Sequence, residues 1–258
     1  MIKRSTYLNV LLKLIALIIF LLLWFLASKD SKLLIPDPFE VIEETYKLFR
    51  SAEFYSSLFF TMKRMLIGFS LSVITSILIS LLMEKYKLIK MFFETYVNAA
   101  LLIPAIIFVY IIVIIFGVKE ITPILIIILI TAPELIIILS TSLENINKNY
   151  TQVAKVYKIN KITQLFKIIF PQIIPNFFAA LKIEFSVAWK MAIIAEAFAL
   201  SNGIGYAIYY QFQLFSLRGV LSWTIAFMII MTILQYGLIS FIEKKLLKWK
   251  TSNHYGLN

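Results

Sequence analysis

Cysteine is absent from the 258 residues, and histidine occurs only once, as His254 in the polar C-terminal tail. Without cysteine the chain has no disulfide bond, no thiolate nucleophile and no cysteine-ligated metal. A single tail histidine also argues against a histidine-based metal cluster or catalytic triad. None of the seven glycines belongs to a Gly-x4-Gly-Lys-Ser/Thr phosphate-binding loop. The sequence therefore predicts no metal site, no cofactor and no ATPase site of its own.

Charged residues are also scarce, at 15%, whereas apolar residues make up 61% of the chain. A soluble domain of this length cannot cover so many apolar side chains, since soluble domains are close to half apolar. The net charge of +11 comes from lysines and arginines beside apolar stretches, which is typical of a membrane topology signal. We therefore predict an all-α, multi-pass protein of the bacterial inner membrane, with the lipid bilayer and not nucleic acid as its partner.

A helix needs about 20 apolar residues to cross the hydrocarbon core. Six stretches are predicted to do so, at residues 9–27, 59–83, 90–116, 121–142, 176–200 and 221–242. Pro104 interrupts the third stretch. The first resembles a signal peptide, but it is long and lacks a small-residue cleavage site, so an uncleaved anchor is expected. Six spans place both termini on one side, and the distribution of Lys and Arg places that side in the cytoplasm.

These spans are predicted to form a single transmembrane domain over residues 1–258. Residues 1–57 hold the first span and an external amphipathic segment, residues 58–245 form the core, and residues 246–258 form a cytoplasmic tail. No internal repeat suggests a carrier built from two halves.

The predicted cytoplasmic loop at residues 144–175 is long, polar and rich in lysine. Apolar residues recur in it at helical spacing, in the sets Val153, Val156, Tyr157 and Ile162, Leu165, Phe166. Pro171 and Pro175 precede the fifth span, and we place Pro175 near the first turn of that helix. The pattern alone permits two interpretations, an interfacial helix on anionic lipid or a coupling helix that inserts into a groove of a cytoplasmic protein.

The loop resembles that of binding-protein-dependent ABC permeases, whose pattern is Glu-Ala-Ala, three residues, Gly, about nine residues and Ile-x-Leu-Pro. The resemblance implies an ATPase-coupling loop made of Gln152, Val153, Ala154, Val156, Tyr157, Lys158, Ile168, Phe170 and Pro171. Gln152, Lys158 and Phe170 replace the acid, the glycine and the leucine of that pattern. If the turn requires a left-handed backbone, Lys158 costs about 1 kcal/mol or more, and otherwise the turn is built differently.

Other segments resemble, in the same order, landmarks of the sulfonate, nitrate and taurine branch of that family. They are residues 34–38, 62–64 with Gly68, 102–104, 116–117, 188–189, 195–196 and 203–206. The resemblance covers nearly the whole chain and implies the permease subunit of an ATP-driven importer. It implies as partners a second permease copy, two ATP-binding subunits that hold the ATP, and an external binding protein. The solute would be a sulfonate, nitrate, taurine or a related organic compound.

Three charged residues within the predicted spans are candidate site residues, because ionisable groups at membrane depth are costly. Glu134 and Lys190 lie near the middle of the fourth and fifth spans, so we predict a structural ion pair between them. A role in the solute pathway and a position in a wet cavity are the alternatives. Glu196 lies near the external end of the fifth span, where we expect a gate or scaffold role. Gly203 and Gly205 are expected to permit a sharp external turn.

Three other classes of protein remain as alternatives. The membrane component of a vitamin-type ATP-driven importer also has cytoplasmic coupling helices, but it usually lacks the landmarks after the loop. An ATP-independent carrier or channel would leave the long loop unexplained. An intramembrane enzyme lacks a buried histidine, a cysteine and any carboxylate pair at catalytic spacing.

Overall fold

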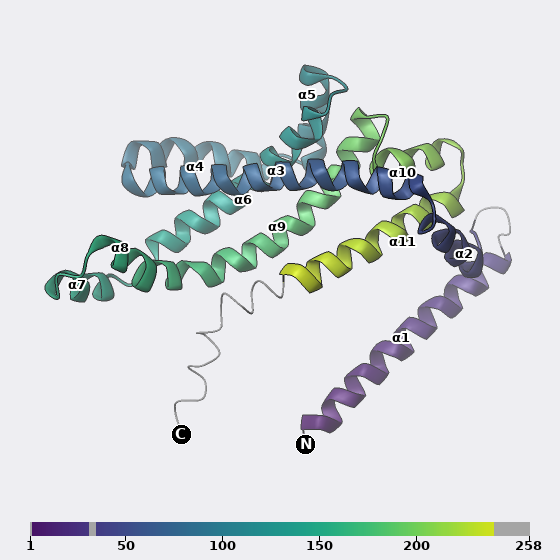
Figure 1. Ribbon diagram of the computed structural model, residues 1–258, viewed down its shortest axis with the longest axis horizontal. Helices are drawn as coiled ribbons and strands as arrows, with labels where there is room; N and C mark the ends of the chain where they lie inside the picture. The colour runs from purple at the N-terminus through teal and green to yellow at the C-terminus, as the bar shows by residue number, and fades with distance from the viewer. Residues whose placement is uncertain (1, 31–34, 240–258) are drawn as a thin grey trace.

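The computed structural model describes residues 2–30 and 35–239, and within these residues all regular structure is helical, as predicted (Figure 1). The elements are α1 (Ile2–Asp30), α2 (Pro38–Leu48), α3 (Ala52–Lys85), α4 (Lys87–Leu102), α5 (Ala105–Phe116), α6 (Ile121–Glu144), α7 (Lys148–Val156), α8 (Lys161–Gln164), α9 (Phe170–Ala199), α10 (Ile204–Gln213) and α11 (Leu217–Ile233). Two π-helical turns, Leu165–Ile169 and Leu234–Ile239, follow α8 and α11. The predicted end of the last span at Ile242, the tail lysines and His254 lie outside the described residues.

Four helical segments of the described chain are long and apolar enough to cross a membrane. They are Leu11–Lys29 in α1, all of α3, all of α6, and Leu217–Gly237 in α11 and its π-helical turn. The pair α4 and α5 would add a fifth span if its two halves count as one. The helix α9 is long enough but carries four charged residues between Lys182 and Glu196. The predicted number of six spans therefore stays a prediction.

The third predicted span is broken at Pro104, where α4 and α5 meet at an angle of 103°. Proline disfavours the helical conformation of the residue before it, and Ile103 is extended, with ψ at 125°. Gly117 then ends α5 in a left-handed conformation, with φ at 69°. The interruption follows from the sequence, whereas the size of the bend does not.

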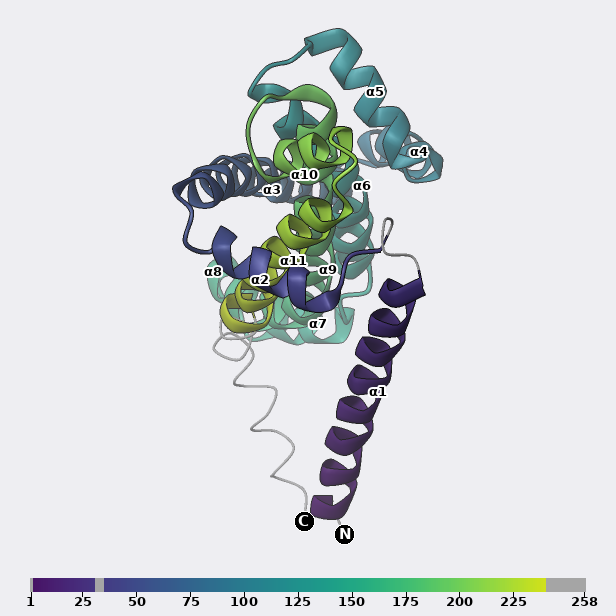
Figure 2. The ribbon, with the colours of Figure 1, turned by 90° about the vertical axis from the view of Figure 1, so that its right-hand side faces the viewer.

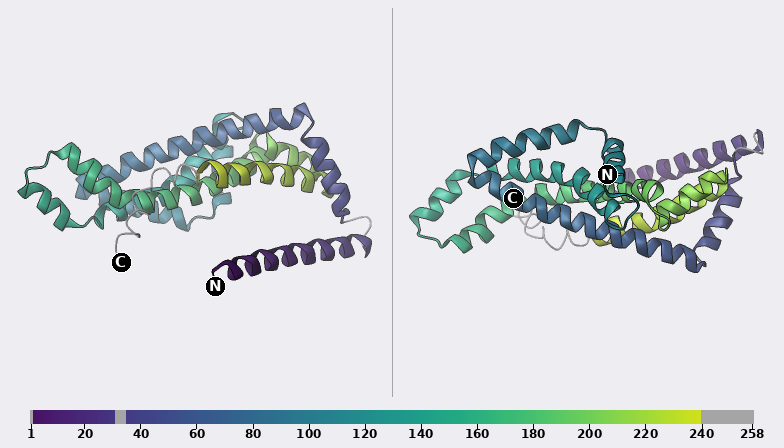
Figure 3. Two further views of the ribbon diagram at one scale, coloured as in Figure 1. Left: turned by 60° about the horizontal axis from the view of Figure 1, so that its bottom comes forward. Right: turned by 90° about the horizontal axis from the view of Figure 1, so that it is seen from above.

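The centre of the bundle is the layer in which α3 packs along α6 and α6 packs along α9 (Figures 1 and 3). Ser72, Ser76 and Ser80 form a buried stripe on α3, and small side chains permit close approach of helices in a membrane. The Ser76 hydroxyl donates to the carbonyl of Ala132 at 3.2 Å, and the Ser80 hydroxyl donates to that of Ile136 at 3.1 Å. This contact holds α3 and α6 in register.

The segment α2 is amphipathic, as predicted, and packs against α11 near one end of the bundle. Asp37 caps its first turn by accepting a hydrogen bond from the Phe39 amide at 2.7 Å. The Ser222 hydroxyl on α11 donates to the Val41 carbonyl at 3.3 Å. By contrast, α1 runs apart from the bundle and is joined to it mainly near α2, where the Trp24 indole donates to the Pro36 carbonyl (Figure 2).

Pro175, which was predicted near the first turn of the fifth span, lies inside that helix, because the helix begins earlier than the predicted span. The helix α9 begins at Phe170, directly after a π-helical turn, so Pro171 is its second residue. The second apolar repeat of the loop is also not a separate helix. The four-residue α8 continues through the π-helical turn Leu165–Ile169 directly into α9.

Candidate functional site

The helix α7 projects with α8 from the end of the bundle opposite α2 (Figures 1 and 3). The Asn147 side chain caps α7 by accepting from the Asn149 amide at 2.9 Å. Ala154 is 1% exposed and anchors the helix, whereas Val156 and Tyr157 are 78% and 76% exposed. Val153 and Gln152 are exposed as well. The predicted coupling segment therefore presents uncovered apolar side chains on a helix held by its small buried alanine.

The turn after α7 has the geometry that a glycine normally supplies. Lys158 is left-handed, with φ at 50°. Its amide donates to the Lys155 carbonyl at 3.0 Å, and the Ile159 amide donates to the Ala154 carbonyl at 2.9 Å. These two bonds form a Schellman motif. The chain thus keeps the left-handed turn and tolerates the strain of a lysine in it.

Gln172 joins the two ends of the loop, and the sequence analysis missed it. Its side-chain oxygen accepts from the Asn147 amide at 2.9 Å, and its side-chain nitrogen donates to the Ile168 carbonyl at 2.8 Å. Gln172, in the first turn of α9, therefore holds Asn147, the residue that caps α7. Phe170 is exposed and stacks on Phe166, with ring centroids 5.5 Å apart. A glutamine one residue after Pro171 carries no pattern that would have marked this role.

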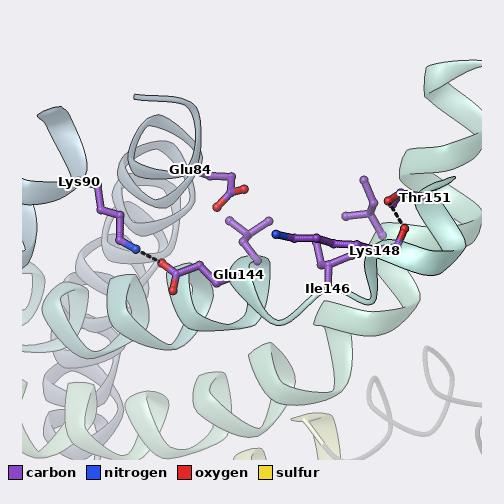
Figure 4. A pocket seen from close by; sticks show the side chains of 8 residues that line it. Glu84, Lys90, Glu144, Ile146, Lys148 and Thr151 are labelled. Atoms are coloured by element: carbon purple, nitrogen blue, oxygen red, sulfur yellow. Dashed lines mark hydrogen bonds and ion pairs between the residues drawn. The ribbon is translucent and has the colours of Figure 1, made fainter. Parts of the chain in front are cut away.

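A polar pocket of about 440 Å³ lies between the base of α7 and the adjacent ends of α3, α4 and α6. Figure 4 shows Lys90 of α4 directed at Glu144, the last residue of α6, with which it forms an ion pair. The same view shows Lys148 and Thr151 from the first turns of α7 along the pocket. The pocket therefore lies at the junction between the spans and the coupling segment.

At the opposite end of the bundle, the side chain of Arg64 is buried in a network of ion pairs. It is 1% exposed, and its guanidinium contacts Glu196 of α9 at 2.8 Å. It also contacts Glu120, which immediately precedes α6, and the side chain of Asn202. Hydrogen bonding with the Arg64 guanidinium holds the pKa of the Glu120 carboxyl below its usual value. Arg64 thus ties α3 to the ends of α6 and α9.

Glu196 is completely buried, and each of its carboxylate oxygens has partners. One oxygen accepts from Arg64, and the other accepts from the Thr61 hydroxyl at 2.7 Å and the Gly205 amide at 3.0 Å. At Gly203, φ is 102°, and a Cβ there would overlap the Glu196 carboxylate. The two glycines thus turn the chain closely around Glu196, and this geometry fits the scaffold role expected for that residue.

The structure does not bring Glu134 and Lys190 together, so the predicted ion pair between them is absent from the described ion pairs. Lys190 lies on the exposed side of α9, with its ammonium 5.6 Å from the centre of the Trp189 ring. Glu134 instead lies against the carboxyl of Glu184, which is about 1.7 turns before Lys190 on α9. Matching depth along two helices was not sufficient, because the residue of α9 that meets Glu134 is Glu184, and Lys190 lies on another side of that helix.

The helical fold, with several apolar helices and a structured loop at one end, is that of a multi-pass membrane protein. The chain belongs to the family described as binding-protein-dependent transport system inner membrane component, whose family model matches residues 72–248. It is therefore a transport subunit, the permease of an ABC importer, as the resemblance of its motifs implied.

Several relatives carry this resemblance across most of the chain. A putative aliphatic sulfonates transport permease protein of Bacillus subtilis is 23% identical over 86% of this chain and 80% of its own length. A formylaminopyrimidine transport permease protein of Halalkalibacterium halodurans is 25% identical over 84% of this chain and 86% of its own length. A nitrate import permease protein of Synechocystis is 22% identical over 76% of this chain and 74% of its own length.

The fold also matches a solved transporter. A chain in the crystal structure of an amino acid ABC transporter with histidines superposes with a TM-score of 0.60 and 20% sequence identity. The match covers 74% of this chain and 92% of the other.

Proposed function

We propose that the chain works as a homodimer whose two copies form the path for a small solute. An external binding protein delivers the solute, and two ATP-binding subunits supply the energy, because the chain has no phosphate-binding loop. Six spans would cross the inner membrane with both termini in the cytoplasm. Lysines gather at the α7 end of the bundle, and this supports placing that end in the cytoplasm.

The observation that carries this proposal is the exposed apolar surface of α7. Val153, Val156 and Tyr157 lie on a short helix that is held by buried Ala154 and by Gln172. An amphipathic helix with uncovered apolar residues fits a hydrophobic groove on a partner. Docked in a groove of an ATP-binding subunit, α7 would transmit closure of the ATP sites to α6 and α9, which flank it in the chain. Rigid-body motion of the spans would follow.

The solute is proposed to be a sulfonate, nitrate, taurine or a related organic compound. Relatives are described as permeases for aliphatic sulfonates, nitrate and formylaminopyrimidine, so the family does not restrict the solute to one charge. The binding protein would make the first selection, and the permease would need only contacts that let the solute pass.

Replacing Val156 or Tyr157 with aspartate tests the docking, because these side chains are exposed and their change leaves the fold of α7 intact. Leu88 is 81% exposed in the first turn of α4, near the same end of the bundle, so Leu88→Asp is the matched control. We expect Val156→Asp and Tyr157→Asp to lower recovery of the ATP-binding subunit at least about tenfold, the loss of one buried apolar anchor at an interface. Recovery is measured by purifying the tagged chain in mild detergent.

Wild-type recovery of Val156→Asp and Tyr157→Asp with the ATP-binding subunit would favour the other interpretation, a helix that lies on lipid. Ala154→Asp is less informative, since Ala154 is buried and its replacement would disrupt α7 itself.

A further inference from the structure

Glu184 is the buried acid of the described chain whose charge has no visible compensation. It is 1% exposed, and one of its carboxylate oxygens, Oε1, has no hydrogen-bond partner among the described residues. An unpaired buried carboxylate is costly, and buried charges normally have a counter-charge or hydrogen-bond donors. The described part of the chain therefore provides no donor for this buried oxygen.

The group that Glu184 does meet is a second acid. The carboxyl of Glu134 on α6 lies against it across the α6–α9 contact. Two ionised carboxylates at one site repel each other, so the pair either shares a proton or holds a positively charged group between its oxygens. Lys190 does not fill this place, because its ammonium lies over the Trp189 ring.

The two acids differ in exposure, and this gives the site an opening. Glu134 is exposed near the middle of α6, whereas Glu184 lies behind it in the interior. A carboxylate at that depth is not stable against lipid tails, so its open side must face an aqueous path or a second protein. In the proposed dimer, that side would face the solute path.

We propose that Glu134 and Glu184 form a recognition site for a positively charged nitrogen of the solute. This inference rests on the proposed function, and it narrows the solute to an organic compound with an ammonium, amidinium or guanidinium group. Such a group offers N–H donors to both carboxylates, including the unpaired Glu184 oxygen, with bonds that are stronger for their charge. A bare anion such as nitrate would meet two negative charges.

A divalent metal is a poorer occupant of the site. In residues 2–30 and 35–239, no third Asp, Glu, His or Cys joins the two acids to form a metal-binding group. Metal ions with oxygen ligands usually require six or more of them. A donor-bearing nitrogen needs only the two carboxylates.

The test uses the importer complex purified in detergent without nucleotide, with thermal unfolding as the measure of binding. The probes are methylammonium and guanidinium chloride, with sodium chloride, sodium nitrate and sodium methanesulfonate as comparisons at equal ionic strength. We expect a saturable rise in unfolding temperature with methylammonium and guanidinium alone. Glu134→Gln and Glu184→Gln should each raise the apparent dissociation constant at least about tenfold, whereas Glu53→Gln, an exposed acid of α3, should not change it.

Three results would overturn the assignment. They are no shift with either nitrogen cation, an equal shift with sodium or with an anion, and a shift that survives in both glutamine variants. Unfolding without probe checks that the variants fold, because each amide is nearly isosteric with the acid it replaces. Recovery of the ATP-binding subunit and ATP hydrolysis are measured on the same samples. Their absence contradicts the proposed function and not the cation site, so the two failures are distinguishable.

Discussion

The two buried acids of α9 lie in opposite chemical surroundings. Glu196 meets Arg64, Thr61 and the Gly205 amide, so both of its oxygens have partners. Glu184 lies about 18 Å away along the same helix at 1.5 Å per residue. Among the described residues it meets another acid and keeps an unpaired oxygen. A buried acid whose oxygens all have hydrogen-bond partners holds helices together, whereas a buried acid with an unpaired oxygen can accept a ligand.

The largest expected effect comes from breaking the ion pair between Arg64 and Glu196. Arg64→Ala leaves Glu196 buried without its counter-charge, so we expect about 3–5 kcal/mol of lost stability. The measurement is the free energy of unfolding in detergent, with fluorescence of the four tryptophans as the signal. A loss below about 1 kcal/mol, as for an exposed ion pair, would mean that water stabilises the charge of Glu196 once Arg64 is gone. The surroundings of Glu196 and Glu184 would then not differ as we describe.

The backbone around Glu196 should be nearly as sensitive. A Cβ at Gly205 would overlap the backbone carbonyl of Ile193, and backbone cannot move aside as a flexible side chain can. Gly205→Ala is expected to cost roughly 1–3 kcal/mol. Gly237→Ala is the control, since a Cβ there has no atom within 4 Å and the change should have little effect. Equal unfolding temperatures for the two variants would contradict the close packing around Glu196.

Neutralising each acid in turn should change stability with opposite sign. Glu196→Gln weakens the bond to Arg64 and should cost about 1.5–3 kcal/mol, the scale of a hydrogen bond to a charged group. Glu184→Gln gives Glu134 an N–H donor and removes a repulsion, so stability should rise by on the order of 1 kcal/mol. Thermal unfolding of both variants side by side decides the matter. A fall in both cases would assign Glu184 to the scaffold as well.

The smallest expected effect concerns backbone strain at the other end of the molecule. Lys158→Gly removes the cost of a left-handed lysine and should stabilise the turn after α7 by about 1 kcal/mol. Slower amide hydrogen exchange at Ile159, whose N–H closes that turn, is the local measurement. Exchange around Glu196 and Glu184 should stay unchanged, and faster exchange at Ile159 would show that Lys158 makes a stabilising contact of its own.

Prediction from sequence succeeded where the signal is local. Apolar runs located the long helices, Pro104 located the break in the third, and the glycine position of the loop pattern located the left-handed turn at Lys158. The apolar positions of α7 were expected to be a docking face, and the structure leaves them exposed. Whether they dock stays a prediction.

Prediction failed where the outcome depends on the direction of a side chain across helices. The sequence shows that Glu134 and Lys190 lie at similar depth, but a helix turns by about 100° per residue, so depth does not define a partner. Arg64 lies within the predicted second span but was not among the candidate charged residues, so its burial between three elements was missed. Gln172, which ties α9 to α7, has no sequence signal at all.

The sequence by itself determined the class of protein, its family and the position of the helical loop that we propose to be the coupling segment. Composition and apolar run length are summed along the chain and need no contact to be read. Only the tertiary structure decided which buried charged groups have all their hydrogen-bond partners. The partners of Glu196 on α9 are donors from α3 and from the chain at Gly205. Glu196 and the donors of α3 are far apart in sequence and meet only when the helices pack.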